Sequence, residues 1–409
     1  MKRRNNDFDL SGEEVVGEFM KAYDSHSSRS SRSSHTHNKH HHLHTDHHNA
    51  ATEEDACKQH RKHNAHKEKQ RFPLIFKILI IIIAVLFFLA ILGCGALLVM
   101  HRRGMNDINK KKEEATIQTI ENVVTYDESG KTVEYNGQKY VYNEDVITAV
   151  FLGIDDKSVN VNITDEYGTA GQADTIMLLA YDTESGSVSI LTIPRDTIAD
   201  VDVYSASGKF ARTEKMQICL SFAYGDGGEA SCENVIKSIE RVLMGIPIDS
   251  YFSLRVRGVD ALNAAVGGVE LTSLETIGQF VKGEKIRLTG TAARFYCTSR
   301  DRSKIDSDAL RRQRQIQYVK AYAAKVMSMA KDDIGIITKL YNTAKQYSVT
   351  DISLSSAVYI GSELVESSAT INKVTSLQGE YVANGKFPQF IVDEESTYET
   401  ILDIFYKKA

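Results

Sequence analysis

The sequence predicts an α/β protein with a mixed central sheet flanked by helices, preceded by a disordered tail and one transmembrane helix. Three features support this: a polar N-terminal segment, an uninterrupted apolar run, and short apolar segments that alternate with amphipathic ones beyond it. We therefore divide the chain into a tail (1–72), a transmembrane helix (73–100), a linker with a hairpin (101–145), a main domain (146–330) and an extension of unknown role (331–409).

The tail is polar and of low complexity. Residues 25–34 are rich in Ser and Arg, and eight histidines fall within residues 35–48. Such a composition cannot bury a core, so we expect disorder. The histidines offer loose metal binding, but a solvated tail is the favoured interpretation. Residues 11–23 (SGEEVVGEFMKAY) fit a short amphipathic helix, either a docking segment or a nascent helix.

Residues 78–100 form an apolar run of 23 residues without a charge. A helix rises 1.5 Å per residue, so this length spans a hydrocarbon core of about 30 Å. The run is too long, and begins too late in the chain, for a cleaved signal peptide. Basic residues flank both sides, so the positive-inside rule favours a cytoplasmic N-terminus only weakly.

The segments that follow predict strands interspersed with helices. EYNGQKYVY places an Asn-Gly turn between two alternating segments, which indicates a hairpin. Strands are predicted for AVFLGID, DTIMLLAYD, SVSILTIPRD, YFSLRV, VELT and KFPQFIV. Helices are predicted for MQICLSFAYG, ENVIKSIERVLMG, VDALNAAVGG and a long segment at residues 309–330. This alternation predicts a mixed sheet covered by helices.

Charge and cysteine usage narrow the possible functions. The net charge of −5 argues against nucleic acid as the main partner. The five cysteines show no CxxC pairing, so a zinc site is not expected. Cys219 and Cys232 fall in successive predicted helices, where buried free thiols are favoured and a disulfide stays open.

Charged and polar side chains occur at strand ends and helix starts: Asp155, Asp174, Arg195, Lys215, Arg300, Arg311 and Gln315. Strand ends are where α/β sheets bind ligands. Guanidinium groups suit phosphate, and paired carboxylates suit a hard divalent cation. Residues 311 and 315 share a helix face. Taken singly, an Asp after a strand is more often a turn residue, and an arginine-rich helix start is more often solvated. The combination favours a phosphate ligand.

These segments, in their order, resemble the LytR-CpsA-Psr family over roughly residues 146–330. The resemblance is carried by GID, ADT, SILTIPRD, KMQICLSFAYGDGG, GIPIDSYF, ALNAAVGGVEL, LTGTAARFY and RRQRQ. It implies a phosphotransferase in the cell membrane, single-pass, with a cytoplasmic N-terminus and an extracellular catalytic domain. Such enzymes bind a glycopolymer linked to polyprenyl pyrophosphate, with the lipid in a hydrophobic tunnel, and transfer wall teichoic acid, capsule or similar polymers onto peptidoglycan.

The resemblance also implies roles for individual residues. Asp155 and Asp174 would bind Mg²⁺. The catalytic residues would be Arg195, Asp174 and Arg311. The pyrophosphate would be held by Arg195, Lys215, Arg300, Arg311 and Gln315.

Two positions depart from the family pattern, because Gln172 and Thr298 stand where arginines are common. Either Arg302, Arg312 or Arg314 replaces them, or the activity is weaker or directed at another ligand. Two other functions therefore stay open. One is a transcriptional attenuator, against which the absence of a helix-turn-helix signal and the predicted extracellular domain count. The other is a non-catalytic protein that binds lipid-linked glycan.

Overall fold

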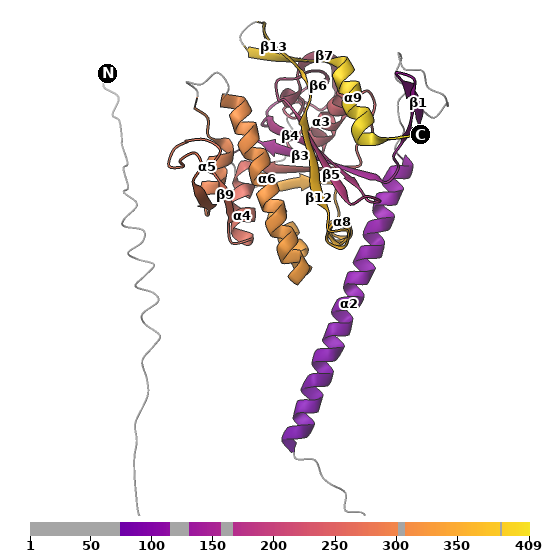
Figure 1. Ribbon diagram of the computed structural model, residues 1–409, viewed down its shortest axis with the longest axis vertical. Helices are drawn as coiled ribbons and strands as arrows, with labels where there is room; N and C mark the ends of the chain where they lie inside the picture. The colour runs from indigo at the N-terminus through magenta and orange to yellow at the C-terminus, as the bar shows by residue number, and fades with distance from the viewer. Residues whose placement is uncertain (1–73, 115–130, 157–166, 302–306, 385–386) are drawn as a thin grey trace, which may run out of the picture. The chain divides into compact units, whose positions relative to one another are not determined.

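The computed structural model describes residues 74–114, 131–156, 167–301, 307–384 and 387–409. The predicted tail and its short helix, as well as Arg302, lie outside these ranges. Among the described residues, the largest sheet has six strands in the order β11-β8-β3-β4-β5-β12 (Figure 1). Its strands are β3 (Val146–Ile154), β4 (Ala173–Asp182), β5 (Ser187–Ile193), β8 (Ser250–Arg255), β11 (Ser348–Thr350) and β12 (Thr370–Ser376).

This sheet is mixed, as the sequence predicts. β3 runs parallel to β8 and antiparallel to β4. β5 runs antiparallel to β4 and parallel to β12. Side chains alternate between the two faces along each strand. In β3, Val150 and Leu152 are fully buried in the main core, whereas Ala149 and Phe151 line a cavity on the opposite face.

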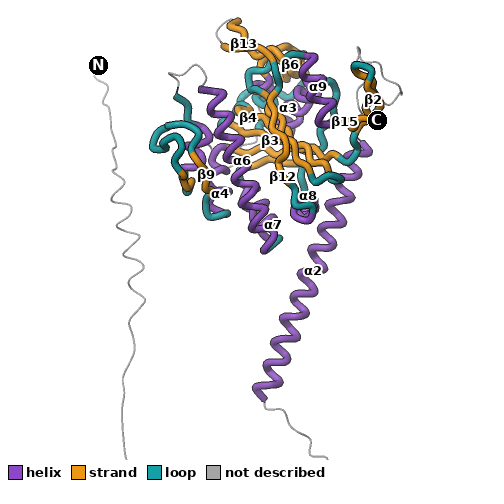
Figure 2. Tube along the Cα trace, viewed as in Figure 1, coloured by secondary structure: helices purple, strands orange, loops and turns teal. Residues whose placement is uncertain are grey.

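Different helices cover the two faces of the sheet (Figure 2). The main core forms where α3 (Glu229–Val242) and α9 (Glu394–Phe405) pack apolar residues against one face. On the cavity side, a second core joins α5 (Ala292–Thr298) and α6 (Ser307–Asp332) to β9 (Val269–Thr272) and β10 (Lys285–Leu288). This second core has its own aromatic centre at Tyr296 and Tyr318, and α4 (Val256–Ala265) lies beside it. The second core thus holds its helices in place by its own packing. Helices α4 and α6 can therefore form the walls of a cavity without filling it.

Helix α2 (Leu74–Glu114) contains the predicted membrane segment and extends well beyond it. Within the described part of the chain, it is the one helix long and apolar enough to cross a membrane. Residues 101–114, which the sequence analysis treated as part of a connector, continue helix α2, which packs on α8 (Leu354–Glu366). Ile108 is buried there, and Lys111 Nζ donates to Asp351 Oδ2 at 2.7 Å.

The predicted hairpin is present, and the C-terminus joins it. β1 (Thr132–Tyr135) and β2 (Gln138–Tyr142) are connected by Asn136 and Gly137, both with positive φ. β15 (Tyr406–Lys408) pairs with the free side of β2. The remaining elements are α7 (Gly335–Ala344), β13 (Gly379–Asn384) and β14 (Phe387–Val392). β14 confirms the strand predicted for KFPQFIV.

One predicted helix, MQICLSFAYG, is not formed. The segment MQICLSFAYG begins as the end of a strand, because β6 (Ile198–Tyr204) and β7 (Phe210–Gln217) form an antiparallel hairpin that the sequence analysis missed. Only a short 3₁₀ turn, Ile218–Ser221, follows. β7 is exposed along most of its length, so it lacks the apolar alternation that marks a half-buried strand.

Gly104 allows α2 and α8 to approach closely. A Cβ built at this position would lie 2.2 Å from the carbonyl oxygen of Ser355 and 2.7 Å from Cβ of Tyr359. We expect Gly104→Val to push the helices apart and to lower the unfolding free energy by about 1–3 kcal/mol. Thermal denaturation of the full chain in detergent measures this. Gly95→Val is the matched control, because a Cβ there meets nothing within 4 Å. Equal melting temperatures for the two variants would contradict the prediction.

Candidate functional site

Three predicted site residues meet at one edge of the central sheet because of its topology. Asp155 follows the end of β3, Asp174 is the second residue of β4, and Arg195 lies two residues after β5. β4 runs antiparallel to both neighbours, so its start lies beside their ends. The strand-end argument from the sequence therefore placed these three residues at the correct edge.

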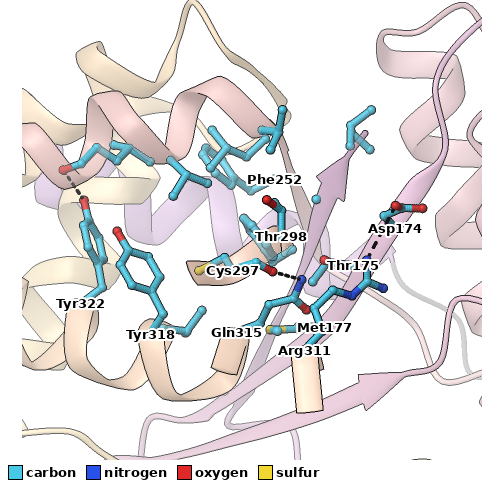
Figure 3. Close-up of a pocket in the computed structure, with 18 of the residues that line it drawn as sticks. Asp174, Thr175, Met177, Phe252, Cys297, Thr298, Arg311, Gln315, Tyr318 and Tyr322 are labelled. Carbon is cyan, nitrogen blue, oxygen red and sulfur yellow. Dashed lines mark hydrogen bonds and ion pairs between the residues drawn. The ribbon is translucent and has the colours of Figure 1, made fainter. Parts of the chain in front are cut away.

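Asp174 lies between two guanidinium groups. Arg195 Nη1 donates to Asp174 Oδ1. Arg311 Nη1 lies 3.9 Å from Asp174 Oδ2 (Figure 3). The Arg311 side chain is 5% exposed, whereas those of Arg195 and Asp174 keep 20% and 18% of their surface. The carboxylate thus offsets the repulsion between two cations that would otherwise face each other across a partly dry site.

A cavity of about 750 Å³ extends from these charges along the sheet, between the strands and helices α4 and α6. Its walls are mostly apolar, with Phe151, Met177 and Phe252 on the strands and Tyr318 and Tyr322 on α6. In Figure 3 the two tyrosines lie well away from Asp174. Its polar end is formed by Asp155, Asp174, Thr298, Arg300, Arg311 and Gln315. The cavity is thus apolar along its length and charged at one end.

Helix α6 presents one face to this cavity. Arg311, Gln315, Tyr318 and Tyr322 recur at helical spacing, so their side chains project from the same side. The Gln315 amide donates to the carbonyl oxygen of Cys297 at 3.1 Å, which ties α6 to the end of α5. This periodicity explains how one helix contributes both the cationic end and the apolar wall.

Lys215 is not brought to this site. It lies in strand β7 rather than at a helix start, its side chain is exposed, and Nζ pairs with Asp200 on β6 at 3.2 Å. Among the described residues, those lining the cavity do not include it. The family resemblance implied that Lys215 contacts the pyrophosphate, and the sequence analysis placed it at the start of a helix, MQICLSFAYG, that is not formed.

Of the three arginines considered as replacements, Arg314 serves the fold. It is fully buried, Nε donates to Glu275 Oε1 at 2.8 Å, and its other nitrogens donate to the carbonyls of Tyr296 and Ser299. Arg312 instead lines a small recess next to the cavity, together with Arg195 and other site residues.

The neutral residue at position 172 has a defined role in the geometry. Arg195 Nη2 donates to Gln172 Oε1 at 2.7 Å. Gln172 and Asp174 together hold the guanidinium of Arg195 in one orientation. The family pattern often has an arginine at this position. This chain has Gln172 there instead, which accepts a hydrogen bond from Arg195 and so orients that guanidinium group.

The sequence analysis missed a buried arginine that supports the loop after β3. Arg255, at the end of β8, is 3% exposed, and its Nε donates to Asp156 Oδ2 at 2.7 Å. The sequence feature that could have indicated it is a charged residue at the end of the largely apolar strand SYFSLR. This ion pair secures the residue next to Asp155.

The four cysteines that the structure describes, Cys94, Cys219, Cys232 and Cys297, are free thiols. Cys219 and Cys232 are both buried and unbonded to each other, so the disulfide considered from the sequence is not formed. Burial raises the pKa of the Cys232 thiol to about 12, and it also raises the pKa of Cys219 although Arg195 lies beside that sulfur. Both thiols are neutral at physiological pH and unsuited to nucleophilic chemistry.

The carboxylates fit a divalent cation only together with a phosphate. Among the described residues, no group of three or more His, Cys, Asp or Glu side chains is arranged to hold a metal ion. Mg²⁺ is usually held by one or two carboxylates, with phosphate oxygens and water completing its shell. Asp155 and Asp174 both line the polar end of the cavity, so this donor set suits a Mg²⁺ shared with a bound phosphate.

An α/β domain with an apolar cavity closed by arginines and carboxylates is suited to an amphiphile with an anionic head group. The model of the LytR_cpsA_psr family matches residues 106–402, and the chain belongs to this family. The match crosses residue 330, where the sequence analysis divided the chain, and that division stays a prediction.

Relatives with assigned activities are transferases. The chain is 26% identical over 269 residues to the polyisoprenyl-teichoic acid–peptidoglycan teichoic acid transferase TagU of Enterococcus faecalis, covering 64% of this chain and 73% of the relative. TagU of Halalkalibacterium halodurans is 32% identical over 152 residues, 36% of this chain and 45% of the relative. A Streptococcus agalactiae crystal structure aligns with a TM-score of 0.51 and 17% identity over 65% of this chain and 90% of that one, which supports the fold alone.

The different burial of two neighbouring arginines predicts different effects on stability. Arg314→Met leaves Glu275 buried without its cation, so we expect a loss of about 3–5 kcal/mol in unfolding free energy. Arg312→Met, on the half-buried side of the same helix turn, should change stability by about 0.5 kcal/mol or less. Chemical denaturation of both variants measures the difference. Similar losses for the two would refute the assignment of Arg314 to the fold.

Proposed function

We propose that this protein is a phosphotransferase that moves a glycopolymer from a polyprenyl-pyrophosphate carrier onto peptidoglycan, outside the cell membrane. The observation that carries the proposal is the pair of guanidinium groups, Arg195 and Arg311, that flank Asp174 at the charged end of a large apolar cavity. The names of the curated relatives, which specify teichoic acid and peptidoglycan, support the same reaction.

The donor fits the cavity by its chemistry. An isoprenoid chain is apolar and suits the walls of strands β3, β4 and β8 and helix α6, while the pyrophosphate suits the charged end. Arginines bind phosphate oxygens through charge-assisted and often bidentate hydrogen bonds. Arg300 is exposed at the same end, where it can meet a ligand that enters from solvent.

The reaction is displacement at the sugar-linked phosphorus. A hydroxyl of the acceptor glycan forms the new oxygen–phosphorus bond, and the bond from that phosphorus to the bridging oxygen breaks. Polyprenyl phosphate leaves with the electron pair. The hydroxyl proton passes to a carboxylate, Asp155 or Asp174. Fixed guanidinium groups stabilise charge that develops on the phosphoryl oxygens without having to reorganise.

Asp155 and Asp174 are the residues that would hold Mg²⁺. The ion would supply charge neutralisation on the pyrophosphate oxygens. Without a ligand, the carboxylate of Asp174 is engaged by Arg195, so cation and phosphate are expected to bind together.

Helix α2 anchors the domain in the membrane, with the N-terminal tail on the cytoplasmic side. The tail precedes the apolar run, and the domain follows it. Peptidoglycan lies outside the membrane, so the domain must face outward for its acceptor. The basic residues that flank the apolar run also favour a cytoplasmic N-terminus, although only weakly, by the positive-inside rule.

Arg195→Ala should lower transfer by about 10²–10³-fold or more while the fold is kept, because it removes a preorganised cation from the site. The measurement uses the purified full-length chain in detergent with Mg²⁺, a polyprenyl-pyrophosphate glycan and peptidoglycan, and follows released polyprenyl phosphate. Arg212→Ala is the control, since Arg212 is exposed on β7 and pairs with Glu214. A wild-type rate in Arg195→Ala would overturn the proposal. Donor binding by the unmodified protein without turnover would favour a non-catalytic binding protein.

Chelation of divalent cations should abolish transfer, and Mg²⁺ should restore it. Asp155→Asn should raise the Mg²⁺ concentration for half-maximal transfer about tenfold or more, because one anionic ligand is lost. Asp332→Asn, at the exposed end of α6, should leave that concentration unchanged. Titration of transfer rate against Mg²⁺ gives the answer. Full transfer activity in the presence of chelator would show that Asp155 and Asp174 do not act by binding a divalent cation.

A further inference from the structure

Two spaces of unequal size meet at the charged site. One is the large cavity, and the other is the recess that Arg312 lines. Both spaces share Asp174, Arg311 and Gln315. The recess holds about 10 Å³, close to the room needed for a single water molecule. A hydroxyl oxygen can enter a space of this size, but a sugar ring must stay outside it.

An exposed aromatic ring lies next to the recess. Nη1 of Arg312 donates to the hydroxyl of Tyr381 at 3.4 Å. Tyr381 is in β13, and 48% of its surface is exposed. Among the described residues, those that line the large cavity include neither Arg312 nor Tyr381. The pair therefore lies outside the large cavity, beside the recess that Arg312 lines.

The hairpin that carries Tyr381 is attached to the segment that carries Arg195. The amide of Phe390, in β14, donates to the carbonyl of Asp196 at 2.9 Å. Gln217 Nε2 donates both to Asp196 Oδ1 at 2.9 Å and to the carbonyl of Pro388 at 2.8 Å. Figure 1 accordingly shows β13 at the same end of the fold as β6 and β7.

The tyrosine ring is itself held in place. Tyr381 pairs with Phe390 across the hairpin, and the two rings pack edge to face with centroids 5.0 Å apart. Phe390 is 5% exposed and belongs to the main core. The tyrosine ring thus packs against a core residue that is hydrogen-bonded to Asp196, the residue after Arg195, although the hairpin is on the surface.

We propose that Tyr381 and Arg312 form a subsite for the acceptor glycan, which rests on the function proposed above. The tyrosine ring packs against the C–H face of an acceptor sugar. The guanidinium of Arg312 hydrogen-bonds the polar groups of that sugar. Together they direct one hydroxyl into the recess, towards the phosphorus held by Arg195 and Arg311. Both are positioning residues that do not touch the bond that breaks.

This role separates transfer to glycan from transfer to water. Water needs no subsite, so hydrolysis of the donor should be unaffected by Tyr381→Ala, while transfer to peptidoglycan should fall about tenfold with a higher KM for the acceptor. Tyr381→Phe keeps the ring and should retain most of the transfer. Phe210→Ala is the matched control, because this ring is 59% exposed on the neighbouring hairpin.

The experiment incubates the full-length chain in detergent with the lipid-linked glycan and Mg²⁺, with and without peptidoglycan fragments. Released polyprenyl phosphate and glycan attached to peptidoglycan are both measured. A lower ratio of transfer to hydrolysis in Tyr381→Ala and in Arg312→Gln, but not in Phe210→Ala, supports the subsite. An unchanged ratio in both variants overturns it, as does an equal loss of the two reactions in variants whose melting temperature is normal. Failure of the unmodified protein to release polyprenyl phosphate under any condition would instead refute the proposed function.

Discussion

The ion pairs around Asp174 are the constraint on which the site depends. Two guanidinium groups on separate elements, a loop after β5 and the start of α6, approach the same carboxylate. Without that carboxylate their mutual repulsion would oppose packing α6 over the sheet edge. The same arrangement leaves the cations ready for an anion, because a pyrophosphate supplies more negative charge than one carboxylate does. The interaction that stabilises the ligand-free fold is therefore one that a ligand can replace.

The rest of the architecture positions these charges. The antiparallel placement of β4 between β3 and β5 brings a strand start and two strand ends to one edge. The self-contained core beneath α6 lets that helix face the sheet without collapsing on it. Core packing normally fills such a space, since interiors approach the density of organic crystals. Here Tyr296 and Tyr318 belong to the second core, which holds α5 and α6 in place by its own packing. The space between α6 and the sheet therefore stays open.

The sequence predicted the fold class and the site edge well, because both follow from local patterns. Apolar strands ending in Asp155 and Arg195 are visible in the chain without any structure. Other features depend on contacts between distant segments. Arg312 and Arg314 are two residues apart, yet Arg314 is buried because Glu275, far away in sequence, and the carbonyls of Tyr296 and Ser299 accept its hydrogen bonds. Lys215 was misplaced because its own strand, β7, is exposed along most of its length and leaves no periodic signal.

The continuous helix from the apolar run into the domain also governs how the protein moves. A flexible connector would let the domain swing about its anchor and sample many tilts. Helix α2 instead packs on α8 beyond the apolar run, with Gly104 permitting near contact of the backbones and Lys111 bonded to Asp351. As a membrane anchor, such a helix transmits its own tilt to the sheet. Encounters with the proposed lipid-linked donor would then depend on lateral diffusion in the bilayer rather than on a tethered search above it.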